Sequence, residues 1–226
     1  MNQKLLILLI AFGLFIMTAC EEEDNNDNNN DKVEANGFTE EINEFLPDSI
    51  INEMENLGME LNTGGNPPNV ENIYEVSPFI LDSSNIASDY SGMSFADLRF
   101  KLYEQDNEEL TIKLDYVNGP EEGTGLGSFI VGDNNQFTLV SEVTTVAYSD
   151  TAIVAMVFSG KMADGGIENF YYANFMIENN GSSYFIENGQ GRVIYDSDGF
   201  SEEVSSLKML RKDASQKNLI TVSGKE

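Results

Sequence analysis

Between residues 67 and 204, apolar and polar residues alternate with a period of two, and this pattern limits the possible folds more than any other feature. Leu98, Phe100 and Leu102 are separated by polar or charged residues, and Ile112 and Leu114 repeat the pattern. Successive side chains of a β-strand point to opposite faces, so each such run predicts a half-buried strand. Short clusters of Asn, Asp and Gly separate the runs. Connections this short predict antiparallel neighbours.

About eight strands are expected in this region. They are predicted at residues 72–81, 95–103, 110–117, 127–131, 137–146, 152–161, 167–177 and 183–195. We predict a mainly β domain over residues 67–204, an antiparallel up-and-down barrel of about eight strands, because closure removes exposed sheet edges. A two-sheet β-sandwich is the alternative. The glycines of residues 123–127 predict a bend or bulge in the fourth strand.

Two positions of this domain resemble lipocalin-like, or calycin, barrels. Asn72-Ile73-Tyr74 stands where that family carries Gly-x-Trp on its first strand, and Arg192 stands where its packing arginine lies on the last strand. Only Arg192 agrees with the family pattern, because Asn72 and Tyr74 replace its Gly and Trp. Tyr74, Tyr116, Tyr172 and Arg192 are the candidate ligand-binding residues. Either these side chains line a ligand mouth or they belong to the core.

The segment of residues 38–62 has helical spacing. Ile42, Phe45 and Leu46 fall on one side, and Ile50 and Met54 continue the apolar face. One or two short amphipathic helices are therefore expected between residues 39 and 57, docked on the β domain or free to bind a partner. Residues 167–177 are bulky on both faces, which predicts that a helix covers the outer face of that strand.

An export signal precedes these segments. Residues 5–16 are apolar and follow a start that contains Lys4, as in a secretory signal peptide. Met17-Thr18-Ala19-Cys20 resembles the bacterial lipobox. This resemblance implies a signal peptide over residues 1–19, lipidation of Cys20 and a membrane anchor at that residue.

The residues after Cys20 are acidic and polar, so residues 20–37 are predicted to form a disordered tether. An acidic run at this place resembles the export signal of surface-exposed Bacteroidetes lipoproteins. Asn66-Pro67-Pro68-Asn69 and Gly189-Gln190-Gly191-Arg192 resemble a Bacteroidetes lipoprotein family of uncharacterised function. The implied location is the outer membrane, with the domain exposed at the cell surface.

Composition excludes several kinds of chemistry. The chain has no His and one Cys, so a Ser-His-Asp triad, a Cys-His pair and the common zinc sites are excluded. With 12 basic and 39 acidic side chains, nucleic acid is not an expected partner. Asp196-Ser197-Asp198-Gly199 resembles the start of a calcium loop, but Phe200 and Leu207 stand where ligands belong, which favours a tight turn. No catalytic residue, metal or cofactor is predicted.

Basic residues outnumber acidic residues in residues 205–226, so this part is predicted to be a basic tail. A short helix is expected over residues 201–212, followed by a solvated end. The leading hypothesis is a lipid-anchored envelope protein with a non-enzymatic domain that binds a small ligand, such as a glycan, or a protein partner. One alternative is a carboxylate-based glycan hydrolase. The other is a structural or interaction lipoprotein with a filled barrel.

Overall fold

The computed structural model describes residues 29–208 and 218–223. This part of the chain is mainly β and contains one short 3₁₀ helix, two α-helices and ten strands. The helices are η1 (Asn29–Lys32), α1 (Glu40–Phe45) and α2 (Asp48–Asn56). The strands are β1 (Asn72–Val76), β2 (Phe79–Ser84), β3 (Leu98–Asp106), β4 (Thr111–Asn118), β5 (Glu121–Asp133), β6 (Gln136–Ala147), β7 (Asp150–Ala163), β8 (Gly166–Glu178), β9 (Gly191–Asp196) and β10 (Phe200–Glu203).

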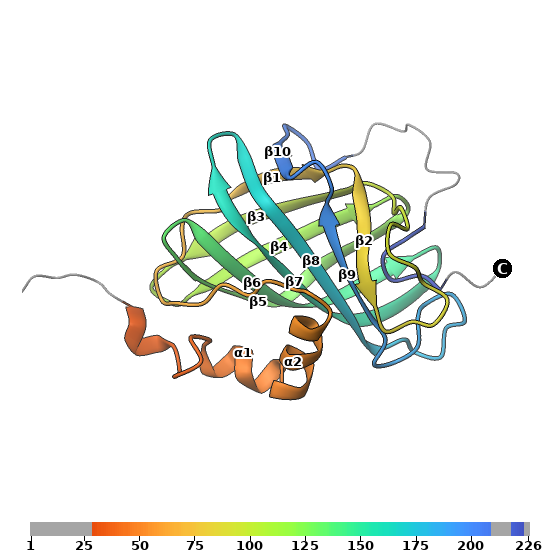
Figure 1. Cartoon of the computed structure of the whole chain (residues 1–226), viewed down its shortest axis with the longest axis horizontal. Coiled ribbons are helices and arrows are strands. Elements are labelled where there is room, and N and C mark those ends of the chain that lie inside the picture. Colours follow the sequence, from red (N-terminus) through yellow and green to blue (C-terminus); the bar gives the residue numbers. More distant parts are fainter. Residues whose placement is uncertain (1–28, 209–217, 224–226) are drawn as a thin grey trace, which may run out of the picture.

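The ten strands form one antiparallel sheet that curls into a barrel-like ring (Figure 1). Strands β1 and β3 to β8 follow one another, and β10 pairs with both β8 and β1, which closes a ring of eight strands. Strand β9 pairs with the later part of β8, and β2 pairs with β9. The predicted antiparallel ring of about eight strands is confirmed, and the sandwich alternative is wrong because one continuous sheet surrounds the core.

The strand that closes the ring was not predicted. A short helix was expected over residues 201–212, but Ser201 lies in β10, opposite Ile167 of β8. Its neighbours Glu202 and Glu203 pair with β1. The expected strand over residues 183–195 is shorter than predicted and comprises only Gly191–Asp196. Pairing with two distant strands decides the conformation of β10, and local spacing does not report it.

The helices cover the outer face of the sheet below β5 to β8 (Figure 1). Thr39 caps α1, because its Oγ1 accepts a hydrogen bond from Ile42 N at 3.2 Å. Ile42 and Met54 are fully buried in a cluster with outward-facing residues such as Ala173. This arrangement confirms the predicted amphipathic helices and the predicted cover over residues 167–177.

Part of the expected tether is ordered. Residues 29–37 were predicted to be disordered, but η1 and the turn after it lie beside the helices, and Val33 packs against the outer cluster. The apolar side chain of Val33 explains the difference, because residues 21–32 before it in the sequence are all polar or charged. The expected signal peptide of residues 1–19, the lipidation site Cys20 and residues 21–28 lie outside the described residues.

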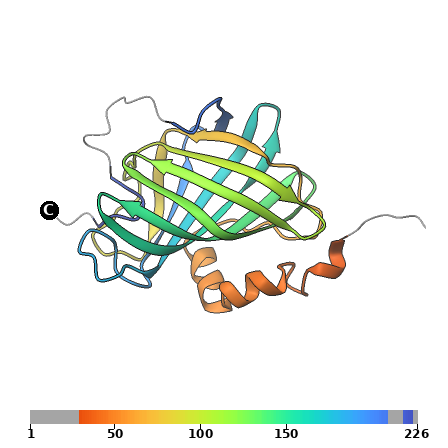
Figure 2. The same cartoon turned by 180° about the vertical axis from the view of Figure 1, so that it is seen from behind.

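Aromatic side chains fill the interior of the ring. The rings of Phe100 and Phe158 lie 4.8 Å apart between centroids, and Phe100 stacks on Phe170 at 5.1 Å. The buried aromatic residues of this inner cluster are Tyr74, Phe79, Phe95, Phe100, Tyr116, Phe137, Phe158, Phe170, Tyr172 and Phe185. The view from behind shows the strands of the other side of the ring (Figure 2). The part of the interior that holds these aromatic residues is therefore a packed core.

The glycines of β5 allow a close approach to β4 and β6. The register of β5 against β6 shifts between Gly125 and Gly127, which confirms the predicted bulge. A Cβ atom on Gly123 would lie 2.4 Å from Cε1 of Tyr116 and 2.9 Å from the carbonyl oxygen of Thr144, whereas a Cβ atom on Gly127 would meet nothing within 4 Å. Gly123 is therefore required for packing, and Gly127 is not.

We expect Gly123→Ala to lower the free energy of unfolding by about 1–3 kcal/mol, because the added methyl group overpacks the interior beside Tyr116. The matched control is Gly127→Ala, which should change the free energy of unfolding by less than about 0.5 kcal/mol. Urea denaturation followed by circular dichroism measures both variants. Equal effects at the two positions would contradict the close contact.

Candidate functional site

Residues 218–223, here called the C-terminal segment, lie at the end of the ring where the β2–β3 and β8–β9 connections meet (Figure 1). Leu219, Ile220 and Thr221 are buried. Backbone hydrogen bonds tie the segment to both connections, from Ala96 N to Asn218 O, from Ile186 N to Thr221 O and from Ser223 N to Tyr184 O. The predicted solvated tail is therefore wrong for these residues, because apolar side chains place them inside the fold.

Glu121, the first residue of β5, links the interior to the C-terminal segment. Its side chain is fully buried. One carboxylate oxygen accepts a hydrogen bond from the Tyr116 hydroxyl at 2.7 Å. The other oxygen accepts from the hydroxyl of Thr221 at 2.7 Å and from its backbone N–H at 3.3 Å. Tyr116 in turn contacts the hydroxyl of Thr145 at 2.5 Å. The carboxylate is thus enclosed by hydrogen-bond donors.

Arg192, on β9, is the largest fully buried side chain, with 2% of its surface exposed. Its Nε and Nη2 atoms donate to the carboxylate of Asp89 at 2.7 and 3.2 Å. Its Nη1 atom donates to the carbonyl oxygens of Leu219, Ile220 and Val222 at 3.3, 2.7 and 3.1 Å. Arg192 therefore pairs with one buried charge and holds three carbonyl groups of the C-terminal segment.

Two buried asparagines complete the contacts to Ile220. Oδ1 of Asn118 accepts from the backbone N–H of Ile220 at 3.2 Å, and Nδ2 of Asn174 donates to its carbonyl oxygen at 3.1 Å. Oδ1 of Asn174 and the hydroxyl of Tyr172 have no hydrogen-bond partner among the described residues. We name five side chains the polar end cluster, and its members are Tyr116, Asn118, Glu121, Asn174 and Arg192.

The structure brings together three of the four candidate ligand residues. Tyr116 and Arg192 belong to the polar end cluster, and Tyr172 lies near enough to it that the charges of Glu121 and Arg192 affect its pKa. Tyr74 makes different contacts, because its hydroxyl donates to the carbonyl oxygen of Val70 at 3.0 Å. All four side chains are buried.

The sequence reasoning missed Asn118, Glu121, Asn174 and Asp89. A signal for Asn118 was present, because it lies two residues after the inward-facing Tyr116 and therefore on the same face of β4. Glu121 and Glu122 are adjacent on β5, so their side chains point to opposite faces, and Glu121 is buried whereas Glu122 is exposed. No local pattern shows that these residues meet.

Burial dominates the electrostatics of the cluster. It raises the pKa of Glu121, although the hydrogen bonds from Tyr116 and Thr221 oppose this shift. It also raises the pKa of Tyr116, which lies beside Glu121, and of Tyr172, where the charge of Arg192 opposes the shift. Burial raises the pKa of Tyr74 as well. Burial thus shifts the ionisation equilibrium of each of these groups toward its neutral form.

The turn after β9 has the predicted capping geometry. Asp198 accepts a hydrogen bond from the backbone N–H of Phe200 at 3.0 Å, which confirms a tight turn. Asp196 is buried and accepts from the Ser201 hydroxyl at 2.8 Å. Burial raises the pKa of Asp196 to about 6, with the Ser201 hydrogen bond opposing and Asp198 adding to the shift. Within residues 29–208 and 218–223, no group of three or more acidic side chains is placed to hold a metal ion.

We expect Asp196 to make stability pH-dependent. Its pKa is about 6 in the folded chain and 3.8 ordinarily, so the folded state binds more protons between these values. Its contribution to stability is therefore greatest below about pH 4 and declines as the pH rises to about 6. Asp196→Asn should remove this decline, while Asp164→Asn in an exposed turn should keep it. Urea denaturation between pH 4 and 7 measures the difference, and parallel curves for the wild type and Asp196→Asn would contradict the assignment.

Comparisons of the chain with protein-family models, with curated proteins and with solved structures found no match. A search of the described residues for membrane spans found no helix with the length and apolar character needed to cross a bilayer.

Proposed function

We propose that the protein is a lipid-anchored cell-envelope protein that acts by binding a protein partner rather than by catalysis. The observation that carries this proposal is that the chain's own residues occupy the ring. Aromatic side chains fill its interior, and the chain's own C-terminal segment covers the polar end cluster. A small-ligand carrier of the lipocalin type needs an empty interior, so the filled barrel favours an interaction protein.

The contacts of Glu121 disfavour the hydrolase alternative. A glycosidase needs two carboxyl groups that both reach the scissile bond. Glu121 is fully buried beneath Thr221 and takes part in three hydrogen bonds, and Glu122 points to the opposite face. Glu121 and Glu122 therefore do not form the pair of carboxyl groups that a glycosidase needs. The chain has no histidine, so few other catalytic groups remain.

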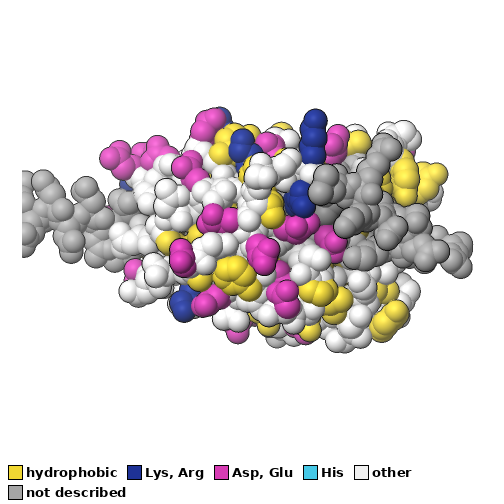
Figure 3. Space-filling model, turned by 90° about the horizontal axis from the view of Figure 1, so that it is seen from above, with side chains coloured by type: hydrophobic (Ala, Val, Ile, Leu, Met, Phe, Trp, Pro, Cys, Tyr) yellow, Lys and Arg dark blue, Asp and Glu magenta, His cyan; other side chains and the backbone are white. Residues whose placement is uncertain are grey.

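The surface charge further limits the class of partner that the protein can bind. Acidic side chains are spread across the face shown in Figure 3. The formal net charge of the chain is −27 at pH 7, which opposes association with nucleic acid and anionic surfaces. We therefore propose that a lipid on Cys20 attaches the protein to the membrane and that the folded domain binds a protein partner.

Mass spectrometry of the membrane fraction tests the anchor. The expected N-terminal peptide begins at Cys20 and carries diacylglycerol. The Cys20→Ser variant cannot carry this lipid, so it should be absent from the membrane fraction. Protease added to intact cells should degrade the domain if it is exposed at the surface. An unmodified Cys20 thiol, or a mature chain that begins at another residue, would contradict the anchor.

Native mass spectrometry of the purified full chain tests the mode of action. We expect the mass of the chain without a small molecule. Hydrolysis assays on glycans should show no activity that depends on Glu121, so the wild type and Glu121→Gln should not differ. A bound small molecule, or an activity lost in Glu121→Gln, would favour one of the alternatives.

A further inference from the structure

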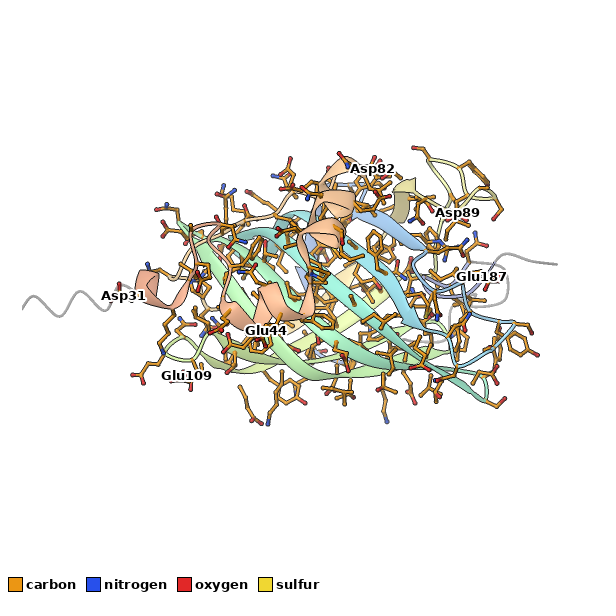
Figure 4. All side chains as sticks on the ribbon, turned by 90° about the horizontal axis from the view of Figure 1, so that it is seen from below. Asp31, Glu44, Asp82, Asp89, Glu109 and Glu187 are labelled. Carbon is orange, nitrogen blue, oxygen red and sulfur yellow. The ribbon has the colours of Figure 1, made fainter. Side chains whose placement is uncertain are left out.

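We propose that the polar end cluster is a binding site for an extended aliphatic peptide, and that the C-terminal segment occupies this site in cis. The inference rests on the proposed binding function and names the class of its ligand. The site lies at the end of the ring where Figure 4 labels Asp89 and Glu187, opposite the end labelled Asp31 and Glu109.

The first argument is how the segment is held. A terminal strand that merely extends a sheet is held by a ladder of backbone hydrogen bonds. Backbone hydrogen bonds join the C-terminal segment to the β2–β3 and β8–β9 connections, and in addition buried side chains from four different strands contact its main chain. They are Asn118 of β4, Glu121 of β5, Asn174 of β8 and Arg192 of β9. Side chains that recognise main-chain groups accept many sequences of the same extended shape.

The second argument is the apolar part of the site. Ile220 is fully buried in the inner cluster, together with Phe95 and Phe185. The guanidinium carbon of Arg192 lies 5.2 Å from the centroid of the Phe95 ring, which keeps this ring in place. The site therefore selects an aliphatic side chain at the position of Ile220 and main-chain polar groups on either side of it.

The third argument is that the segment does not satisfy the whole site. Oδ1 of Asn174 is unpaired although Nδ2 of the same side chain binds Ile220, and the Tyr172 hydroxyl is also buried without a partner among the described residues. An unpaired buried polar atom weakens the complex that leaves it so. A peptide that offers a donor to Asn174 Oδ1 therefore gains a hydrogen bond that the C-terminal segment lacks.

The surroundings of the site favour a longer peptide. Ser223 donates its backbone N–H to the carbonyl oxygen of Tyr184 at 2.7 Å. The exposed rings of Tyr184 and Tyr148 lie 5.7 Å apart at the same place. These two rings give an apolar surface to a peptide that continues beyond the position of Ser223.

Peptide exchange in the full chain tests the proposal. A protease recognition sequence is inserted among residues 209–217 and cut after folding, and a fluorescent peptide with the sequence of residues 218–226 is then added. Fluorescence anisotropy should show saturable binding to the cut protein. Binding to the uncut protein should be at least about tenfold weaker, because the tethered segment competes at a high effective concentration.

Peptide variants serve as controls that leave the ring unchanged. The peptide with Ile220→Asp should bind at least about tenfold more weakly, because it places a charge in the apolar part of the site. Size-exclusion chromatography of the uncut chain detects exchange between copies, and a dimer that forms on concentration would support the site, with a second copy as the source of the peptide.

Three results would overturn the proposal. The cut segment could stay bound and never exchange, the emptied ring could stay folded without binding the peptide, or the ring could unfold when the segment leaves. The last result, read by circular dichroism, would make the segment a part of the core. If Cys20 is still lipidated in any of these cases, the peptide site alone fails and the anchored binding protein remains.

Discussion

Arg192→Met is expected to lower the free energy of unfolding by about 3–5 kcal/mol, because it leaves the carboxylate of Asp89 buried without its partner. Only 2% of each side chain is exposed, so water cannot replace the lost pairing. The carbonyl groups of Leu219, Ile220 and Val222 lose their donor in the same variant. Urea denaturation followed by circular dichroism measures the change.

Lys161→Met is the matched control, because Lys161 pairs with Glu168 at 3.1 Å and the two side chains are 49% and 44% exposed. Water screens this pair, so its loss should change the free energy of unfolding by no more than about 1 kcal/mol. The double variant Arg192→Met, Asp89→Leu should recover part of the loss, since it removes the unpaired carboxylate as well. A cost at Arg192 as small as that at Lys161 would contradict the buried pair.

Phe100→Ala is expected to cost a similar amount, about 3–5 kcal/mol, because it opens a cavity at the centre of the packed interior. The ring of Phe100 lies within 5.3 Å of the Tyr74 ring between centroids and contacts Phe158 and Phe170. These neighbours are themselves held by the strands of the ring, so they cannot collapse far into the empty space. Thermal and urea denaturation measure the loss.

Tyr90→Ala is the control for this experiment, because the side chain of Tyr90 is 66% exposed. It should change the free energy of unfolding by less than about 0.5 kcal/mol. If Phe100→Ala is as harmless as Tyr90→Ala, the interior is not tightly packed. In that case the small-ligand hypothesis would regain support.

The two large effects probe different parts of the molecule. Phe100 reports on the packing of the aromatic interior. Arg192 reports on the end of the ring, where buried polar groups hold an extended segment. The proposed peptide site lies at the end of the ring where these buried polar groups contact the C-terminal segment.

The elements with local signals could be predicted from the sequence alone. The alternation in residues such as Leu98, Phe100 and Leu102 arises because successive side chains of a strand face opposite sides, so antiparallel strands could be predicted without any tertiary information. The spacing of Ile42 and Met54 identified the helices in the same way. Closure into a ring followed from the physical penalty on exposed sheet edges.

The closure of the ring and the contents of its end depend on contacts between residues that are far apart in the sequence. Residues of β10 pair with β8 and β1, and Glu121 binds Thr221, a residue 100 positions later in the chain. Arg192 meets Asp89 from 103 positions away. Contacts between residues so far apart leave no period in the sequence, because they depend on the register and curvature of the whole sheet. The sequence therefore identified Arg192 and Tyr116 as candidate residues, but the fold alone placed them around the C-terminal segment.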